Sequence, residues 1–145
     1  MRWSFVHMGV VAVFLCAEAS QAGDALKGPV RAQVLRVIDG DTLEVNAIIW
    51  VDQTIRTRVR LSRVDTPELH GRCAEEKRLA EAARDYLRKR VENREVVLKN
   101  VQWGKYAGRV LADVESLDGE SLARSLVEQG FARPYDGKKR KPWCL

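Results

Sequence analysis

Four carboxylates occur in two short motifs that suit the binding of a divalent cation. The motifs are Asp39-Gly40-Asp41-Thr42 and Val64-Asp65-Thr66-Pro67-Glu68. Hard oxygen ligands of this kind suit an ion such as Ca²⁺, and a glycine between two of them lets the backbone turn sharply. Each motif also has an ordinary structural interpretation, because Asp-Gly is a common turn and Thr-Pro-Glu can open a helical turn.

Arginines occur close to these carboxylates in the sequence. Period two in an extended segment puts Arg56, Arg58 and Arg60 on one face, opposite the apolar residues. Arg60 precedes Asp65 by only five residues, so we expect it to reach the acidic site. For Arg56 and Arg58 an ordinary solvated face is the alternative.

A glycine-flanked turn supplies a second group of candidate residues. It contains Gly104 and Gly108 and presents Lys105, Tyr106 and Arg109. Guanidinium groups match phosphate oxygens in a bidentate way. Two arginines that face a carboxylate-bound cation would therefore suit a phosphodiester.

Short strands and two helices must position these residues. Alternating apolar residues predict strands near 30–37, 43–51, 55–61, 96–101 and 109–114. The alternation slips at Leu35, which predicts a bulge in the first strand. Helical spacing predicts an amphipathic helix over 74–91 and a shorter helix that begins near Ser121 and stops at Gly130. This order favours a mainly β, α+β domain built on a small closed OB-like barrel, a natural platform for single-stranded nucleic acid.

Length and composition fit one globular domain. The chain has 145 residues and a net charge of +5, with 46% hydrophobic and 31% charged residues, which excludes a disordered chain and a multi-pass membrane protein. The excess of positive charge favours a polyanionic partner.

The first 22 residues have the order of a secretory signal. A basic start, a short apolar segment and the small residues Ala19, Ser20 and Ala22 predict cleavage before Gly23, with an uncleaved anchor as the alternative. We therefore expect residues 1–22 to be a signal peptide and 23–145 to be a single domain with a short basic tail. Export to the periplasm or the medium follows from this interpretation.

The cysteines fit an oxidising compartment. Cys16 would leave with the signal, so Cys73 and Cys144 would remain as an even pair, which predicts a disulfide. Two free thiols are one alternative, and a zinc site that adds His70 is another.

Taken together, the motifs resemble the staphylococcal (micrococcal, thermonuclease-like) nucleases over about residues 30–135. The motifs that carry the resemblance are Asp39-Gly40-Asp41-Thr42, Arg60, Asp65-Thr66-Pro67-Glu68, Lys105-Tyr106-x-Gly108-Arg109-x-Leu111-Ala112 and Leu126-Val127-x-x-Gly130-Phe131-Ala132. The resemblance implies a five-stranded OB-like barrel of the staphylococcal nuclease type and Ca²⁺-dependent cleavage of DNA and RNA that leaves 3′-phosphate ends.

The same resemblance implies roles for individual residues. Asp41 and Asp65 would ligate the ion by their carboxylates, and Thr66 would do so by its backbone carbonyl. The residues of the implied catalytic trio are Arg60, Glu68 and Arg109. The residues at places that resemble the family's phosphate and nucleotide contacts are Lys105, Tyr106 and Tyr135.

The chain departs from the family pattern at Ala107, an extra residue in the turn, and after Tyr135, where no third helix follows. The segment 138–144 is instead a basic tail that either extends a nucleic-acid track or forms a disordered solubilising end. A disulfide between Cys73 and Cys144 would hold it in place.

The sequence thus predicts an exported, monomeric nuclease with no stable membrane association after signal cleavage. Its substrates would be DNA and RNA, with little sequence selectivity and a preference for single or frayed strands, because the phosphate backbone is uniform. A noncatalytic nucleic-acid-binding barrel is the alternative, and a basic membrane-surface protein has only the net charge in its favour.

Overall fold

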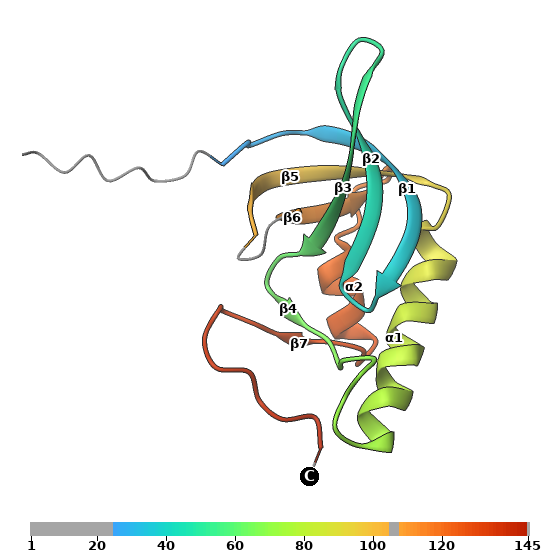
Figure 1. The fold of residues 1–145 in the computed structure, drawn as a ribbon, viewed down its shortest axis with the longest axis vertical. Helices are drawn as coiled ribbons and strands as arrows, with labels where there is room; N and C mark the ends of the chain where they lie inside the picture. The colour runs from blue at the N-terminus through green and yellow to red at the C-terminus, as the bar shows by residue number, and fades with distance from the viewer. Residues whose placement is uncertain (1–24, 105–107, 145) are drawn as a thin grey trace, which may run out of the picture.

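Five strands close into a barrel in this computed structural model, which describes residues 25–104 and 108–144. The strands are β1 (Val30–Asp39), β2 (Thr42–Trp50), β3 (Gln53–Leu61), β5 (Glu95–Trp103) and β6 (Arg109–Ser116). Their order around the barrel is β1-β2-β3-β6-β5, and every neighbouring pair is antiparallel except β3 and β6. The predicted OB-like α+β barrel is confirmed (Figure 1).

Alternation of side chains explains why these strands form a barrel. Residues such as Val34, Val45 and Val59 are fully buried, while their sequence neighbours face outward. The register of β1 against β2 shifts between Val34 and Arg36, which is the bulge that the pattern slip at Leu35 predicted. Bulges of this kind increase the bend that a small closed barrel requires.

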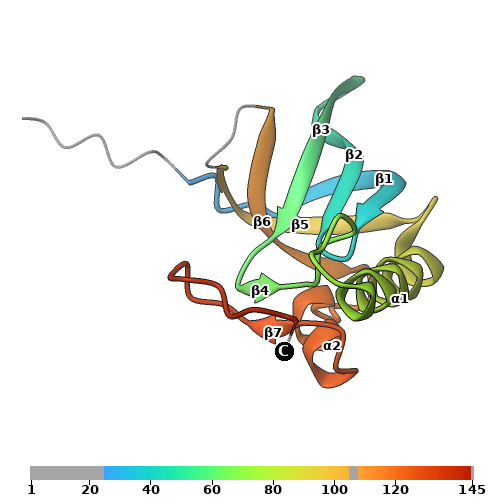
Figure 2. The same cartoon turned by 60° about the horizontal axis from the view of Figure 1, so that its bottom comes forward.

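Two helices lie beside the barrel (Figure 2). Helix α1 (Ala74–Val91) has the predicted bounds and buries Ala80, Ala83 and Leu87. Basic residues in its last turn stabilise the helix by interacting with the negative end of its dipole. Helix α2 (Leu122–Glu128) begins after Ser121, whose side chain accepts a hydrogen bond from the backbone N of Arg124. Within the described residues, no helix has the length and apolar character needed to span a membrane.

A second, two-stranded sheet was not predicted. It pairs β4 (Val64–Asp65) with β7 (Arg133–Pro134) in antiparallel register, and it lies between the end of β3 and the C-terminal tail (Figure 1). Strands of two residues carry no periodic pattern, so sequence reasoning had no signal for them. The segment that follows, residues 66–68, is not helical, so the alternative in which Thr66 opens a helical turn is wrong.

Candidate active site

The site forms where three segments meet at one end of the barrel. Asp41 lies in the turn between β1 and β2, and Asp65 lies in β4. Arg60 is directly opposite Thr42 in the β2–β3 register, and the backbone N of Leu61 donates to the carbonyl of Asp41 at 2.8 Å. The closed barrel therefore brings the ends of the first and third strands together, and Arg60 reaches the acidic site as predicted.

Gly40 lets this turn pack against the rest of the protein. A Cβ atom at Gly40 would stand 2.9 Å from Cβ of Ala83 on α1 and 3.0 Å from Cβ of Thr66. Any side chain at this position would push the turn away from both. Gly40, in the first acidic motif, therefore allows the β1–β2 turn to pack closely against Ala83 and Thr66.

Asp41 is a buried carboxylate held by several groups. It is 3% exposed, its Oδ1 accepts a hydrogen bond from Oγ1 of Thr42 at 3.0 Å, and it is ion-paired with Nη1 of Arg60. Burial raises the pKa of the Asp41 carboxyl above its ordinary value, and the charge of Arg60 opposes that shift. The backbone N of Asp41 donates to Oδ1 of Asp39, which fixes the turn.

Arg60 links the two acidic segments. Its Nη1 contacts Asp41, while its Nη2 donates to the carbonyl oxygen of Val64 at 3.3 Å. One guanidinium group therefore sets the position of the β1–β2 turn relative to β4. Its side chain is only 14% exposed, so the planar group is held in one place.

Asp65 is the second buried carboxylate, 4% exposed. Its Oδ2 accepts a hydrogen bond from Nε1 of Trp143 at 3.2 Å. Its Oδ1 lies 3.0 Å from Nε of Arg140, yet within the described residues this oxygen accepts no hydrogen bond of acceptable geometry. This buried oxygen has an ion pair but accepts no hydrogen bond, and a divalent cation is the kind of partner that satisfies such a carboxylate oxygen.

The three predicted catalytic residues line one cavity. Arg60, Glu68 and Arg109 line a hollow of about 560 Å³, together with Tyr135 and Arg140. An adjoining cavity of about 620 Å³ is lined by Asp65 and Thr66 and shares Glu68 and Arg140 with the first. The structure therefore brings the predicted trio together beside the predicted ligands.

Arg109 enters this cavity from the first position of β6. Its carbonyl accepts a hydrogen bond from the backbone N of Gly104 at 3.0 Å, and a Cβ atom at Gly104 would stand 2.5 Å from that oxygen. The glycine therefore allows β5 and β6 to approach closely just before Arg109. Lys105 and Tyr106, the predicted substrate contacts in this turn, lie outside the described residues.

Tyr135, the third predicted substrate contact, is tied to the barrel and to the tail. Its backbone N donates to the carbonyl of Arg63 at 2.9 Å, and its hydroxyl donates to the carbonyl of Lys138 at 2.7 Å. The side chain also lies against Arg140, whose Cζ is 5.9 Å from the ring centroid. Tyr135 therefore shapes both the cavity and the path of the tail.

The C-terminal tail covers the acidic site, which sequence reasoning did not foresee. Arg140 pairs with Asp65 through Nε and with Glu68 through Nη1. Burial lowers the pKa of Arg140, but the hydrogen bond to Glu68 and the charges of Asp65, Glu68 and Asp41 outweigh burial and raise it. One tail cation is thus within electrostatic reach of all three site carboxylates.

A disulfide and a stacked arginine hold the tail there. Cys73 and Cys144 are joined, with their Cα atoms 6.1 Å apart. The Arg133 guanidinium lies 3.7 Å from the Trp143 ring centroid and donates to the carbonyl of Pro142. The basic run 138–141 signalled a charged tail, but nothing in it singled out Arg140 as the residue that reaches the carboxylates.

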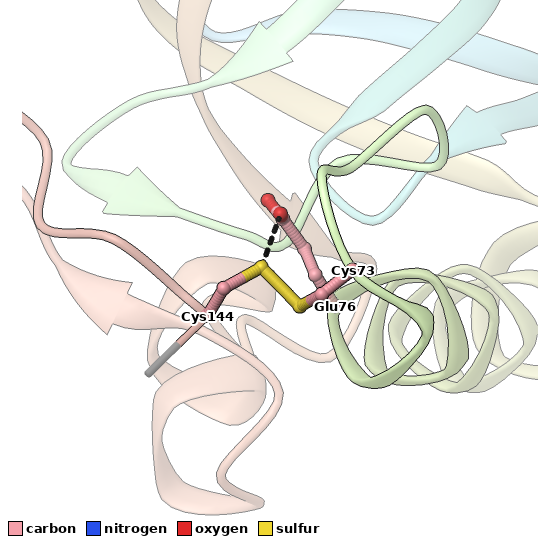
Figure 3. A group of neighbouring side chains, drawn as sticks. All are labelled: Cys73, Glu76 and Cys144. Carbon is pink, nitrogen blue, oxygen red and sulfur yellow. Dashed lines mark hydrogen bonds between the residues drawn. A yellow bond between two sulfur atoms is a disulfide. The ribbon is translucent and has the colours of Figure 1, made fainter.

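Glu76 connects the disulfide to the loop that carries Glu68 (Figure 3). Its Oε2 lies 3.4 Å from Sγ of Cys144 and accepts a hydrogen bond from the backbone N of Arg72 at 2.9 Å, while its Oε1 accepts from the backbone N of Glu68 at 3.4 Å. The zinc alternative with His70 does not fit, because both sulfurs are bonded to each other and the third potential ligand beside them is Glu76.

Comparison with known proteins decides the family. The family model described as staphylococcal nuclease homologue matches residues 58–142, which is more than half of the chain. The chain belongs to this staphylococcal nuclease family. Metal dependence is a property of the family. The matched range contains Arg60, Asp65, Glu68 and Arg109, whereas Asp41 precedes it.

Two curated relatives add a description of activity. Proteins of Escherichia coli and Escherichia coli O157:H7, each described as an uncharacterized endonuclease, are 29% identical to this member of the staphylococcal nuclease family over 116 residues. The match covers 78% of this chain and 66% of each relative, so the chain spans slightly less than two thirds of their length.

Proposed function

We propose that this protein is an exported, metal-dependent nuclease that hydrolyses phosphodiester bonds of DNA and RNA and leaves 3′-phosphate ends. The observation that carries the proposal is the single cavity lined by Arg60, Glu68 and Arg109 beside the buried carboxylates Asp41 and Asp65. Membership of a metal-dependent nuclease family supports it. Export rests on the signal-like residues 1–22, which lie outside the described residues.

Ca²⁺ is the proposed ion, because the available donors are hard oxygens. Asp41 and Asp65 would hold it by their carboxylates and Thr66 by its backbone carbonyl. The chemistry that a bound cation supplies is neutralisation of charge on the phosphoryl oxygens. Oδ1 of Asp65, which accepts no hydrogen bond from the described residues although it is ion-paired with Arg140, fits this role.

The chain's own residues carry the rest of the reaction. Arg60 and Arg109 would bind the non-bridging oxygens of the phosphate and stabilise the negative charge that develops on them in the transition state. Glu68, exposed at the cavity, would orient a water molecule and take its proton as the water oxygen bonds to phosphorus. The bond from phosphorus to the 5′ oxygen breaks, and that oxygen takes a proton from solvent. The products are a 3′-phosphate and a 5′-hydroxyl.

A time course of nucleic-acid degradation tests the proposal. Single-stranded DNA and RNA are incubated with the oxidised protein in Ca²⁺, in Mg²⁺ and in chelator, and the product ends are identified. Cleavage that requires Ca²⁺ and leaves 3′-phosphates is the expected result. Tight binding without cleavage in any metal would instead favour the noncatalytic barrel.

A further inference from the structure

The C-terminal tail brings a third arginine into the catalytic cavity. Arg140 lines the same hollow of about 560 Å³ as Arg60, Glu68 and Arg109. It also lines the two cavities that adjoin this one. The proposed reaction gives no task to its guanidinium group.

Arg140 decides the sign of the charge in the catalytic cavity. The charged side chains that line the cavity are three arginines and two carboxylates, those of Asp39 and Glu68. Without Arg140 this lining would be neutral, and with Arg140 it carries a net positive charge. A net positive cavity suits a phosphodiester, because its phosphate is negatively charged.

The Arg140 guanidinium contacts the proposed base. Its Nη1 pairs with Glu68, and its Nε lies 3.0 Å from Oδ1 of Asp65. In the proposed reaction Glu68 holds the water that attacks phosphorus, so the scissile phosphate must lie next to Glu68. A guanidinium group that touches this carboxylate is therefore next to the reacting phosphate as well.

The contact with Glu68 can be exchanged for a contact with phosphate. The side chains of Arg140 and Glu68 are 41% and 55% exposed, and ion pairs this open to solvent contribute little to stability. The planar guanidinium group matches phosphate oxygens in a bidentate way. Arg60, by contrast, uses Nη1 for Asp41 and Nη2 for the carbonyl of Val64. A third arginine can therefore supply donors that Arg60 uses within the protein.

Anchors on the tail keep Arg140 at the site. Cys144 is bonded to Cys73, the N-cap residue of α1 (Figure 3), and Nε1 of Trp143 donates to Oδ2 of Asp65 at 3.2 Å. The described part of the tail after β7 contains neither helix nor strand, so regular structure does not position Arg140. Delivery of its guanidinium group therefore depends on these anchors.

We propose that Arg140 is a third phosphate-binding residue of the active site, delivered to the substrate by the disulfide-tethered tail. Its guanidinium group leaves the carboxylates when substrate binds and donates to a non-bridging oxygen of the scissile phosphate, beside Arg60 and Arg109. This inference rests on the proposed nuclease function. It makes full activity depend on the disulfide between Cys73 and Cys144.

Arg140→Gln tests the phosphate contact. Its control is Lys139→Gln, which removes the same charge one residue earlier in the tail and should cleave like the unmodified protein. Single-turnover cleavage of a single-stranded oligonucleotide is measured in saturating Ca²⁺, which removes any difference in ion affinity. Arg140→Gln is expected to cleave about ten- to hundredfold more slowly, the loss for one charge-assisted hydrogen bond. Arg140→Lys keeps the charge without the planar group and should regain part of the rate.

A binding measurement detects the same contact without relying on cleavage. Affinity for the oligonucleotide is measured by fluorescence anisotropy in saturating Ca²⁺ between about 50 and 200 mM salt, with Glu68→Gln in every variant to slow cleavage. Addition of Arg140→Gln is expected to reduce the slope of log affinity against log salt by about 0.7, the value for one phosphate contact on a single strand. Addition of Lys139→Gln should leave the slope unchanged. Equal slopes with and without Arg140 would refute the contact.

Cys144→Ser tests delivery by the disulfide. It is expected to slow cleavage by a factor similar to that of Arg140→Gln, and the double variant is expected to lose little more, because a released tail no longer presents the guanidinium group. Circular dichroism and urea denaturation establish whether Cys144→Ser is folded under the assay conditions. If it is not folded, the Arg140 variants still decide the phosphate contact. A full multiplicative loss in the double variant would contradict delivery by the disulfide.

Failure of this inference and failure of the nuclease proposal are distinguishable. Cleavage by Arg140→Gln as fast as by Lys139→Gln would overturn the inference and leave the nuclease function intact. Faster cleavage by Arg140→Gln at limiting Ca²⁺, with an unchanged rate at saturation, would also overturn it, because the tail would then be a plug on the carboxylates. If the unmodified protein cleaves no nucleic acid in any metal, the proposed function itself is wrong.

Discussion

Nε of Arg140 lies 3.0 Å from Oδ1 of Asp65, and the same guanidinium pairs with Glu68 through Nη1. A residue from the C-terminal tail thus contacts a proposed metal ligand and the proposed base at once. Two cations cannot both be held tightly at Asp65 without mutual repulsion. Metal binding and the tail contact are therefore expected to compete.

Removal of the Arg140 charge should tighten metal binding. Arg140→Gln is expected to raise the affinity for Ca²⁺ by about tenfold, because the ion no longer displaces a charge-assisted contact worth about 1.5 kcal/mol. Calorimetric titration of the protein with Ca²⁺ measures the change. Lys139→Gln, the same charge loss one residue earlier in the tail, is the control. Equal or weaker affinity in Arg140→Gln would show that the guanidinium does not compete with the ion.

The disulfide should matter for stability as well as for the position of the tail. It closes a loop with a sequence separation of 71, for which the chain-entropy estimate is about 4 kcal/mol. Cys144→Ser is therefore expected to lower the free energy of unfolding by up to that amount, measured by urea denaturation. An unchanged denaturation midpoint would contradict the idea that this bond staples the tail to the domain.

Glu76 should act as a positioning residue for Glu68. Its two carboxylate oxygens accept hydrogen bonds from the backbone N atoms of Glu68 and Arg72, and an amide in its place can accept at only one of those positions. Glu76→Gln is expected to lower kcat by about tenfold while KM stays unchanged, since the substrate contacts remain.

Glu75→Gln is the matched control, because Glu75 is the exposed neighbour that pairs with Arg78 on the outside of α1. Steady-state kinetics of both variants separate the two roles. A rise in KM with constant kcat in Glu76→Gln would mean that the residue shapes substrate binding, against this assignment.

Much of this fold follows from local patterns in the sequence. The bounds of α1 follow from the apolar spacing, and the bulge in β1 follows from the slip at Leu35. The helical spacing also places Glu76 on the buried face of α1, ahead of Ala80 and Ala83. A structural role for Glu76 could therefore have been predicted from the sequence. A carboxylate on that face indicates a buried polar role.

The position of the tail could not be predicted from local sequence. The contact between Arg140 and Asp65 joins residues 75 positions apart, and it depends on a disulfide and on Trp143 packing against Arg133. Tertiary packing of this kind leaves no periodic trace. The aspartates and arginines of the site could be predicted from the sequence, because carboxylates ligate divalent cations and guanidinium groups bind phosphate. The distances between these side chains could not be predicted.

The raised pKa of Asp41 predicts a gain in stability when its charge is removed. Burial favours the protonated form in the folded state, so the ionised carboxylate destabilises the metal-free protein once the pH rises through the folded pKa. Asp41→Asn is therefore expected to be more stable than the unmodified protein at pH 7 in chelator. The difference should vanish at a pH below the ordinary carboxyl range, where Asp41 is protonated in both states.

Asp118 provides the control of opposite sign. The hydrogen bond from Ser116 lowers the pKa of its carboxyl, so Asp118→Asn is expected to destabilise the protein at pH 7. Urea denaturation at the two pH values measures both variants. A loss of stability in Asp41→Asn at pH 7 would mean that the ion pair with Arg60 outweighs the cost of burial.

The most direct test of the central claim is single-turnover cleavage of a single-stranded oligonucleotide by Glu68→Gln in saturating Ca²⁺. Loss of a positioned general base is expected to slow cleavage by roughly 10²- to 10⁴-fold while affinity in chelator is unchanged. Glu81→Gln, an exposed glutamate of α1, should cleave at the unmodified rate. Cleavage by Glu68→Gln as fast as by Glu81→Gln would contradict the account, because the cavity of Arg60, Glu68 and Arg109 would then not be the place of reaction.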